Sequence, residues 1–323
     1  MRQARFVKIN HERWKAFEEI QAKKIKTSPD ELGDLFIQLT DDLAYAQTHY
    51  PNSEVTEYLN ALTGQAHQEI YRNRRESWDR FVQFWITELP LMFYRGRKAV
   101  LWSFILFAIS VAIGVISTDQ DENFSRLVLG DGYVNMTLEN IKKGDPMGVY
   151  KDEDMLSMFI GIAYNNIRVS LYVFAMGLLT SVGSGYILFK NGVKLGTFQY
   201  FFHQHNLLLE SASSIWIHGT LEICGIILVG AASMVMGSSI LFPGTYSRLE
   251  SFRRGALTGA KMLMGLIPVF IVAAFLEGYV TRLTEWPLWA KLVVIGASAL
   301  FIIWYFIIYP FQLGKHADRI QED

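Results

Sequence analysis

The sequence has little of what marks a disulfide-stabilised, lipid-anchored or nucleic-acid-binding protein. Its one cysteine, Cys224, excludes an internal disulfide. The formal net charge is only −1, so the chain as a whole has no electrostatic preference for nucleic acid, and we expect no nucleic-acid partner. The first 98 residues lack the apolar core of a secretory signal peptide, and no lipidation motif is present. These absences leave the distribution of apolar residues as the main signal.

The apolar residues, 51% of the chain, are concentrated after residue 98. A helix that crosses a lipid bilayer needs about 20 predominantly apolar residues, and the region 99–312 holds several such runs. We therefore predict an all-α, polytopic helical membrane protein that spans the bilayer, with an N-terminal cytoplasmic helical bundle. The expected crossings are 99–117, 158–189, 211–242, 258–280 and 286–310, followed by a tail, 311–323.

The first 75 residues have the periodicity of soluble amphipathic helices. One stripe of apolar residues runs through a predicted helix at helical spacing: Leu32, Leu35, Phe36, Leu39 and Leu43. The next segment, 76–98, mixes Trp78, Phe81 and Trp85 with charged residues and is predicted to lie on the membrane surface as an elbow helix. A fourth helix of the soluble bundle is the alternative for this segment.

Charge gives conflicting information about the number of crossings. Basic residues at 95, 97 and 98 place the N-terminus inside the cell, and the segment 118–157, with nine acidic and four basic residues, is predicted as an extracytoplasmic acidic domain. The basic loop 243–257 also belongs inside by this rule, yet five crossings place it outside. A sixth, partly polar passage through 195–210 would reconcile the two, and we assign 190–210 as a polar or re-entrant segment. We favour five crossings, possibly six, with an irregular or re-entrant segment around 195–225.

A histidine and a carboxylate lie one helical turn apart inside an apolar run. His218 and Glu222 share a helix face, and Glu277 could approach them from another crossing. Ionisable groups at membrane depth are costly and usually face protein or a water-filled cavity. We add Asn165, Asn166 and Arg168 to this candidate intramembrane polar centre, which could serve helix packing or a proton or ion pathway.

A metal site is a further interpretation of the same region. Its candidate ligands are His203, His205, His218 and Glu222, because zinc needs three or four converging nitrogen, oxygen or sulfur ligands. No HExxH or comparable zinc signature is present. We therefore expect no cofactor, with a metal ion as the alternative.

Five motifs resemble the stage II sporulation protein M family. They are Asp41-Asp42-Leu43-Ala44 with Tyr50-Pro51, Asn165-Asn166-Ile167-Arg168-Val169, Asn191-Gly192 with Leu195-Gly196, His218-Gly219-Thr220-Leu221-Glu222, and Ala273-Ala274-Phe275-Leu276-Glu277-Gly278. The acidic loop with Gly144-Asp145-Pro146 is similar to the form found in Bacteroidetes-type bacteria.

The resemblance implies a bacterial inner-membrane protein, and in endospore formers the family works with cell-wall hydrolases. We accordingly expect a non-enzymatic subunit of a multiprotein envelope complex, with other envelope proteins as partners and a homodimeric state. A transporter that uses the histidine and glutamate centre is the first alternative. An intramembrane metal-dependent hydrolase is the second.

Overall fold

The computed structural model describes residues 2–23, 29–72, 78–121, 123–144, 155–282 and 286–322. The chain forms two compact units. Residues 1–82 form the N-terminal unit, and residues 83–323 form the membrane unit. Within the described ranges both units are helical and contain no strand.

The N-terminal unit contains the predicted helical bundle. Its helices are α1 (Gln3–Lys23), α2 (Pro29–His49), α3 (Glu54–Arg72) and the short α4 (Trp78–Gln83). The first three enclose a core of their own, in which Trp14, Phe17 and Leu59 are almost completely buried. The apolar stripe of α2 faces this core: Leu39 is buried, and Leu32, Leu35, Phe36 and Leu43 pack against it.

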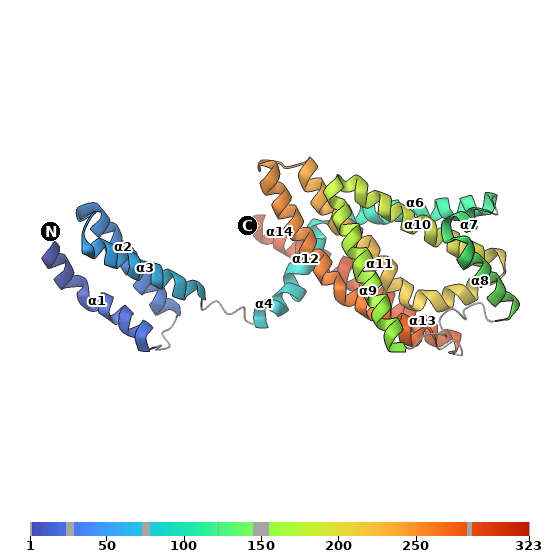
Figure 1. Ribbon diagram of the computed structural model, residues 1–323, viewed down its shortest axis with the longest axis horizontal. Coiled ribbons are helices and arrows are strands. Elements are labelled where there is room, and N and C mark those ends of the chain that lie inside the picture. Colours follow the sequence, from blue (N-terminus) through green and yellow to red (C-terminus); the bar gives the residue numbers. More distant parts are fainter. Residues whose placement is uncertain are drawn as a thin grey trace. The chain divides into compact units, whose positions relative to one another are not determined.

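The membrane unit is built from long helices interrupted by short π and 3₁₀ turns (Figure 1). Its elements are η1 (Phe84–Glu88), α5 (Leu89–Arg95), α6 (Arg97–Gln120), α7 (Phe124–Leu129), α8 (Asp131–Lys142), α9 (Met155–Ala175), η3 (Met176–Leu179), α10 (Thr180–Gln204), α11 (Leu208–Leu241), α12 (Arg248–Phe275), η4 (Leu276–Val280), α13 (Leu288–Ile303), η5 (Trp304–Ile308) and α14 (Tyr309–Glu322).

The polytopic all-α architecture is confirmed. In the part of the chain that the structure describes, five segments are long and apolar enough to cross a membrane: Arg97–Gln120, Met155–Gln204, Leu208–Leu241, Arg248–Val280 and Leu288–Arg319. The most enclosed of them is α11, of whose apolar window 61% is buried. α11 and α12 supply equal numbers of the buried residues in the core of the membrane unit.

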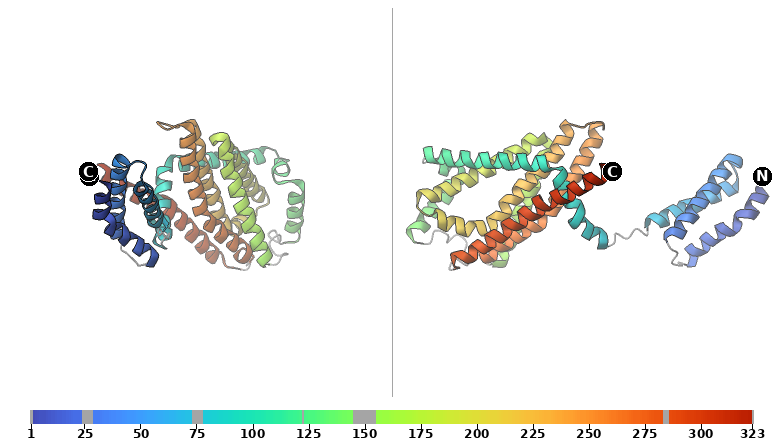
Figure 2. Two further views of the ribbon diagram at one scale, coloured as in Figure 1. Left: turned by 60° about the vertical axis from the view of Figure 1, so that its left-hand side comes forward. Right: turned by 180° about the vertical axis from the view of Figure 1, so that it is seen from behind.

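The second of these segments contains two helices. α9 and α10 meet at Thr180, whose φ of 63° lies in the left-handed region and breaks the helix. This junction lies beside the C-terminal part of α11, where Gly177 and Gly237 permit close contact. From there α9 follows α12 until Phe159 reaches Gly278, and α10 follows α6 until Gln204 reaches Thr118 (Figures 1 and 2). Both helices therefore extend from the junction to the opposite end of the unit.

The irregularity expected around 195–225 is limited to a short turn at residues 205–207, and the rest of this segment is regular helix. α10 continues without a break to Gln204, a short turn follows, and α11 begins at Leu208. The expected polar passage 190–210 is thus the second half of α10 and the turn after it. Its polar residues are accommodated in a helix because Thr197 is buried against the carbonyl of Gly114, whereas His203 and Gln204 are exposed at the helix end.

The predicted elbow is helical through α4, η1 and α5, and Trp78, Phe81 and Ile86 are exposed. Leu89 and Phe93 are buried in the core of the membrane unit, so α5 belongs to that unit and is not a fourth helix of the N-terminal bundle. The predicted tail is also helical, because α14 continues α13 through η5 and packs on α5, where Asp318 accepts a hydrogen bond from Tyr94. Within the predicted acidic domain, α7 and α8 are helical, and residues 145–154 lie outside the described ranges.

Candidate functional site

The site is built on α11, the central helix of the membrane unit. His218 and Glu222 lie one turn apart on this helix, and the side chain of His218 is almost completely buried. α12 runs antiparallel to α11 and brings Glu277 to the same level. The sequence therefore places one imidazole and two carboxylates on facing sides of the same pair of helices.

A π-helical turn positions the residues from α12. In η4 the backbone N–H of Thr281 donates to the carbonyl of Leu276, five residues earlier, at 2.8 Å. One extra residue in this turn changes the direction in which the following side chains point. As a result both Glu277 and Thr281 face His218.

The hydrogen bonds of Thr281 assign the tautomer of His218. The hydroxyl Oγ1 of Thr281 lies 3.0 Å from Nδ1 of His218 and 3.1 Å from the carbonyl oxygen of Leu276. A carbonyl only accepts, so the single hydroxyl proton goes to Leu276, and Oγ1 accepts from an N–H at Nδ1. In the neutral ring, Nε2 then carries the lone pair, and it lies 3.8 Å from Oε1 of Glu277.

Three side chains of the site converge on a small volume. One ligand atom from each of His218, Glu222 and Glu277 lies within 4.8 Å of the other two. Glu222 and Glu277 are less enclosed than the histidine, with 17% of the Glu277 side chain exposed. Such an arrangement can share a proton or hold a cation.

The other predicted site residues do not join this group. His203 is exposed near the end of α10, and His205 caps that helix with Nδ1 2.8 Å from the carbonyl of Phe201. The predicted metal set is therefore not assembled, because these two histidines lie at a helix end and Glu277 takes their place.

Asn165, Asn166 and Arg168 lie in the middle of α9. Asn166 is buried, and its Nδ2 has no hydrogen-bond partner among the described residues. Asn165 and Arg168 are exposed. None of the three is among the residues that surround His218 in the contacts described above.

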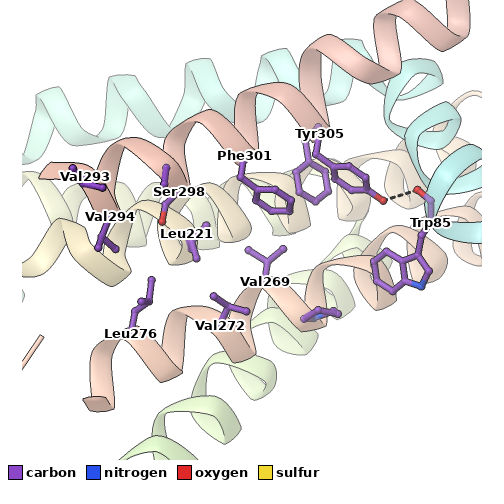
Figure 3. Close-up of a pocket in the computed structure, with 14 residues that line it drawn as sticks. Trp85, Leu221, Val269, Val272, Leu276, Val293, Val294, Ser298, Phe301 and Tyr305 are labelled. Atoms are coloured by element: carbon purple, nitrogen blue, oxygen red, sulfur yellow. Dashed lines mark hydrogen bonds between the residues drawn. The ribbon is translucent and has the colours of Figure 1, made fainter. Parts of the chain in front are cut away.

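The membrane unit also contains an apolar groove (Figure 3). It has a volume of about 760 Å³ and is lined mainly by α12 and α13. Trp85 and Tyr305 stand at one end, where the Tyr305 hydroxyl donates to the Trp85 carbonyl at 2.7 Å. Leu276 lies toward the other end, and it and Leu221, which also lines the groove, directly precede the two glutamates of the site in the chain. His218, Glu222 and Glu277 themselves are not among the described residues that line the groove.

Fold and site together define a polytopic helical membrane protein with a buried histidine and carboxylate centre. The family model of stage II sporulation protein M matches residues 103–282, more than half of the chain, and the chain belongs to this family. A model for a domain of unknown function matches residues 4–72. None of the curated proteins and none of the solved structures matches the chain.

The family match confirms the predicted resemblance and shows which part of the chain it covers. Four of the five motifs fall inside residues 103–282, among them the one that contains His218 and Glu222. The motif with Asp42 and Tyr50 falls outside, in the region matched by the domain of unknown function. The family membership therefore rests on the membrane unit.

Proposed function

We propose that this protein is a non-enzymatic membrane subunit of a multiprotein envelope complex in a bacterial inner membrane. The observation that carries the proposal is the division into two units with separate cores, a membrane unit of the stage II sporulation protein M family and an N-terminal helical unit. A second domain of this kind supplies a surface for partners outside the bilayer. At the end of the membrane unit away from α5, α7 and α8 pack on α10 and α11 around Val134, Phe202 and Ile215 and supply another.

The distribution of charged residues along the chain favours different partners on the two faces of the membrane. Basic residues at 95, 97 and 98, around the start of α6, favour the cytoplasm for the N-terminal unit, and the acidic segment 118–157 favours the outer face for α7 and α8. In this arrangement the membrane unit connects a cytoplasmic partner with an extracytoplasmic one.

Affinity purification from native membranes after mild cross-linking tests this proposal. The full chain is compared with a chain that lacks residues 1–75 and with the variants His218→Ala and Glu222→Gln. We expect a stoichiometric partner with the full chain and with both point variants, and its loss from the truncated chain. Recovery of the full chain without any stoichiometric partner would contradict the proposal. The transporter alternative predicts instead that vesicles containing the protein take up a solute, and that the His218→Ala variant abolishes this flux.

A further inference from the structure

We infer that His218, Glu222 and Glu277 form a binding site for a divalent transition-metal ion, and that Zn²⁺ is the ion that fits it best. The three residues offer one imidazole nitrogen and two carboxylate oxygens, which zinc and its neighbours in the first transition series accept. The site is independent of the partners proposed above.

The distances allow this with a small closure of the side chains. Zinc binds nitrogen and oxygen ligands at about 2.0–2.2 Å, which places two ligands of a tetrahedral ion about 3.4 Å apart. The Nε2 of His218 and the Oε1 of Glu277 are separated by 3.8 Å, and all three ligand atoms lie within 4.8 Å of one another. Rotations within flexible glutamate side chains are sufficient to close this difference.

The hydrogen bonds around His218 prepare it as a ligand. Nδ1 carries the proton and donates to Thr281, which is itself held by the carbonyl of Leu276. Metal-binding histidines characteristically donate their second ring nitrogen in this way, which fixes the ring and the tautomer. The lone pair of Nε2 is thereby directed toward the carboxylate of Glu277, and a cation between two electron-rich groups stabilises both.

Charge and donor type restrict the identity of the ion. A divalent cation matches the charge of two carboxylates, which are costly to bury at membrane depth. Calcium binds six to eight oxygen ligands, and magnesium prefers oxygen in octahedral geometry, so a histidine with two carboxylates suits neither. Three protein ligands leave one position of a tetrahedral zinc ion open to water or to another ligand.

Metal binding by the full-length protein in detergent tests the inference. Wild-type protein is incubated with Zn²⁺, desalted and analysed for metal content, and Co²⁺ is used in parallel because its visible absorption reports coordination geometry. The ligand variants are His218→Ala, Glu222→Gln and Glu277→Gln. The matched controls are His203→Ala and Glu210→Gln, which change the same residue types at exposed positions near the ends of α10 and α11. Circular dichroism and size exclusion select the folded variants.

We expect one ion per chain in the wild type and both controls, and its loss in every folded ligand variant. Thr281→Val keeps the ligands and removes the acceptor of Nδ1, so its affinity should fall about 10-fold to 100-fold. Zn²⁺ should also raise the melting temperature of the wild type and not that of Glu277→Gln. Absence of saturable binding in folded wild type, or binding that persists in His218→Ala and Glu277→Gln, would overturn the site.

Discussion

Asp42 is the residue around which the polar contacts of the N-terminal core are arranged. It is 9% exposed, accepts a hydrogen bond from the indole Nε1 of Trp14 at 2.8 Å, and pairs with Arg13 at 3.3 Å. Trp14 is itself buried and also contacts the ring of Phe6. One carboxylate therefore joins α1 to α2.

Replacement of Asp42 by alanine should destabilise the N-terminal unit by about 1–3 kcal/mol, because it leaves the buried N–H of Trp14 without its acceptor. Asp41→Ala is the control, since Asp41 is exposed on the same helix. Urea unfolding of a fragment covering residues 2–72, whose single tryptophan is Trp14, measures both. Equal midpoints for the two variants would show that the indole hydrogen bond contributes nothing.

The site illustrates what residue patterns can predict at this scale. His218 and Glu222 follow from helical spacing alone, and Glu277 from the rarity of carboxylates in apolar runs. Thr281 was not predicted, because a π turn is not visible in a pattern with the period of an ordinary helix. His203 and His205 were included for their chemistry, but their positions depend on where α10 ends, and spacing does not give that.

The helices α6 and α10 of the membrane unit run parallel and in close contact. Gly114 on α6 and Gly192 and Gly196 on α10 bring the two backbones together. A Cβ atom at Gly192 would lie 2.5 Å from that of Ser110, and one at Gly196 would overlap the carbonyl of Val111. Small residues are thus required along this contact.

Gly196→Ala should destabilise the membrane unit by about 1–3 kcal/mol, the usual cost of overpacking, because a backbone atom blocks the added methyl group. Gly161→Ala is the matched control: it lies on α9, where nothing is within 4 Å of the added atom. The control should be neutral or slightly stabilising, since alanine favours helix more than glycine does. Thermal unfolding in detergent compares them, and equal melting temperatures would refute the close contact.

This contact also explains why the sequence suggested an irregular segment. Polar residues and glycines between 190 and 210 have the composition of a re-entrant passage. In the structure residues 190–204 belong to the single helix α10, because the glycines face α6 and the buried hydroxyl of Thr197 has an acceptor there. Contacts between residues far apart in the sequence stabilise this helix, and such contacts cannot be predicted from the composition of the segment.

At the scale of the whole molecule, the directions of the helices explain how the basic loop 243–257 can lie on the same side of the membrane as the N-terminus. Gly96, at the start of α6, lies beside Val235 near the end of α11, so the loop after α11 is at the same end of the unit as the basic residues around the start of α6. The turn between α10 and α11 is at the other end, with Thr118. The helices α9 and α10 together provide the extra pass that the basic loop requires.

Cysteine labelling in intact cells should therefore place Thr245 on the same side of the membrane as the N-terminus and Glu210 on the opposite side. Thr245→Cys and Glu210→Cys are introduced separately into a Cys224→Ser background, because Cys224 is the native thiol. With the N-terminus in the cytoplasm, an impermeant maleimide should label only Glu210→Cys before lysis. The reverse pattern would mean that Met155–Gln204 crosses once.

The parallel pairing of α6 with α10 has a consequence for biosynthesis. The ribosome completes α6 while α7, α8, α9 and α10 are still to be made, so the first helix enters the bilayer before its principal neighbour exists. Only 22% of its apolar window is covered in the finished unit, which suits a helix that first resides among lipids. The glycine contact can form only once α10 has been made, so the pairing of these two helices is a late step in the assembly of the membrane unit.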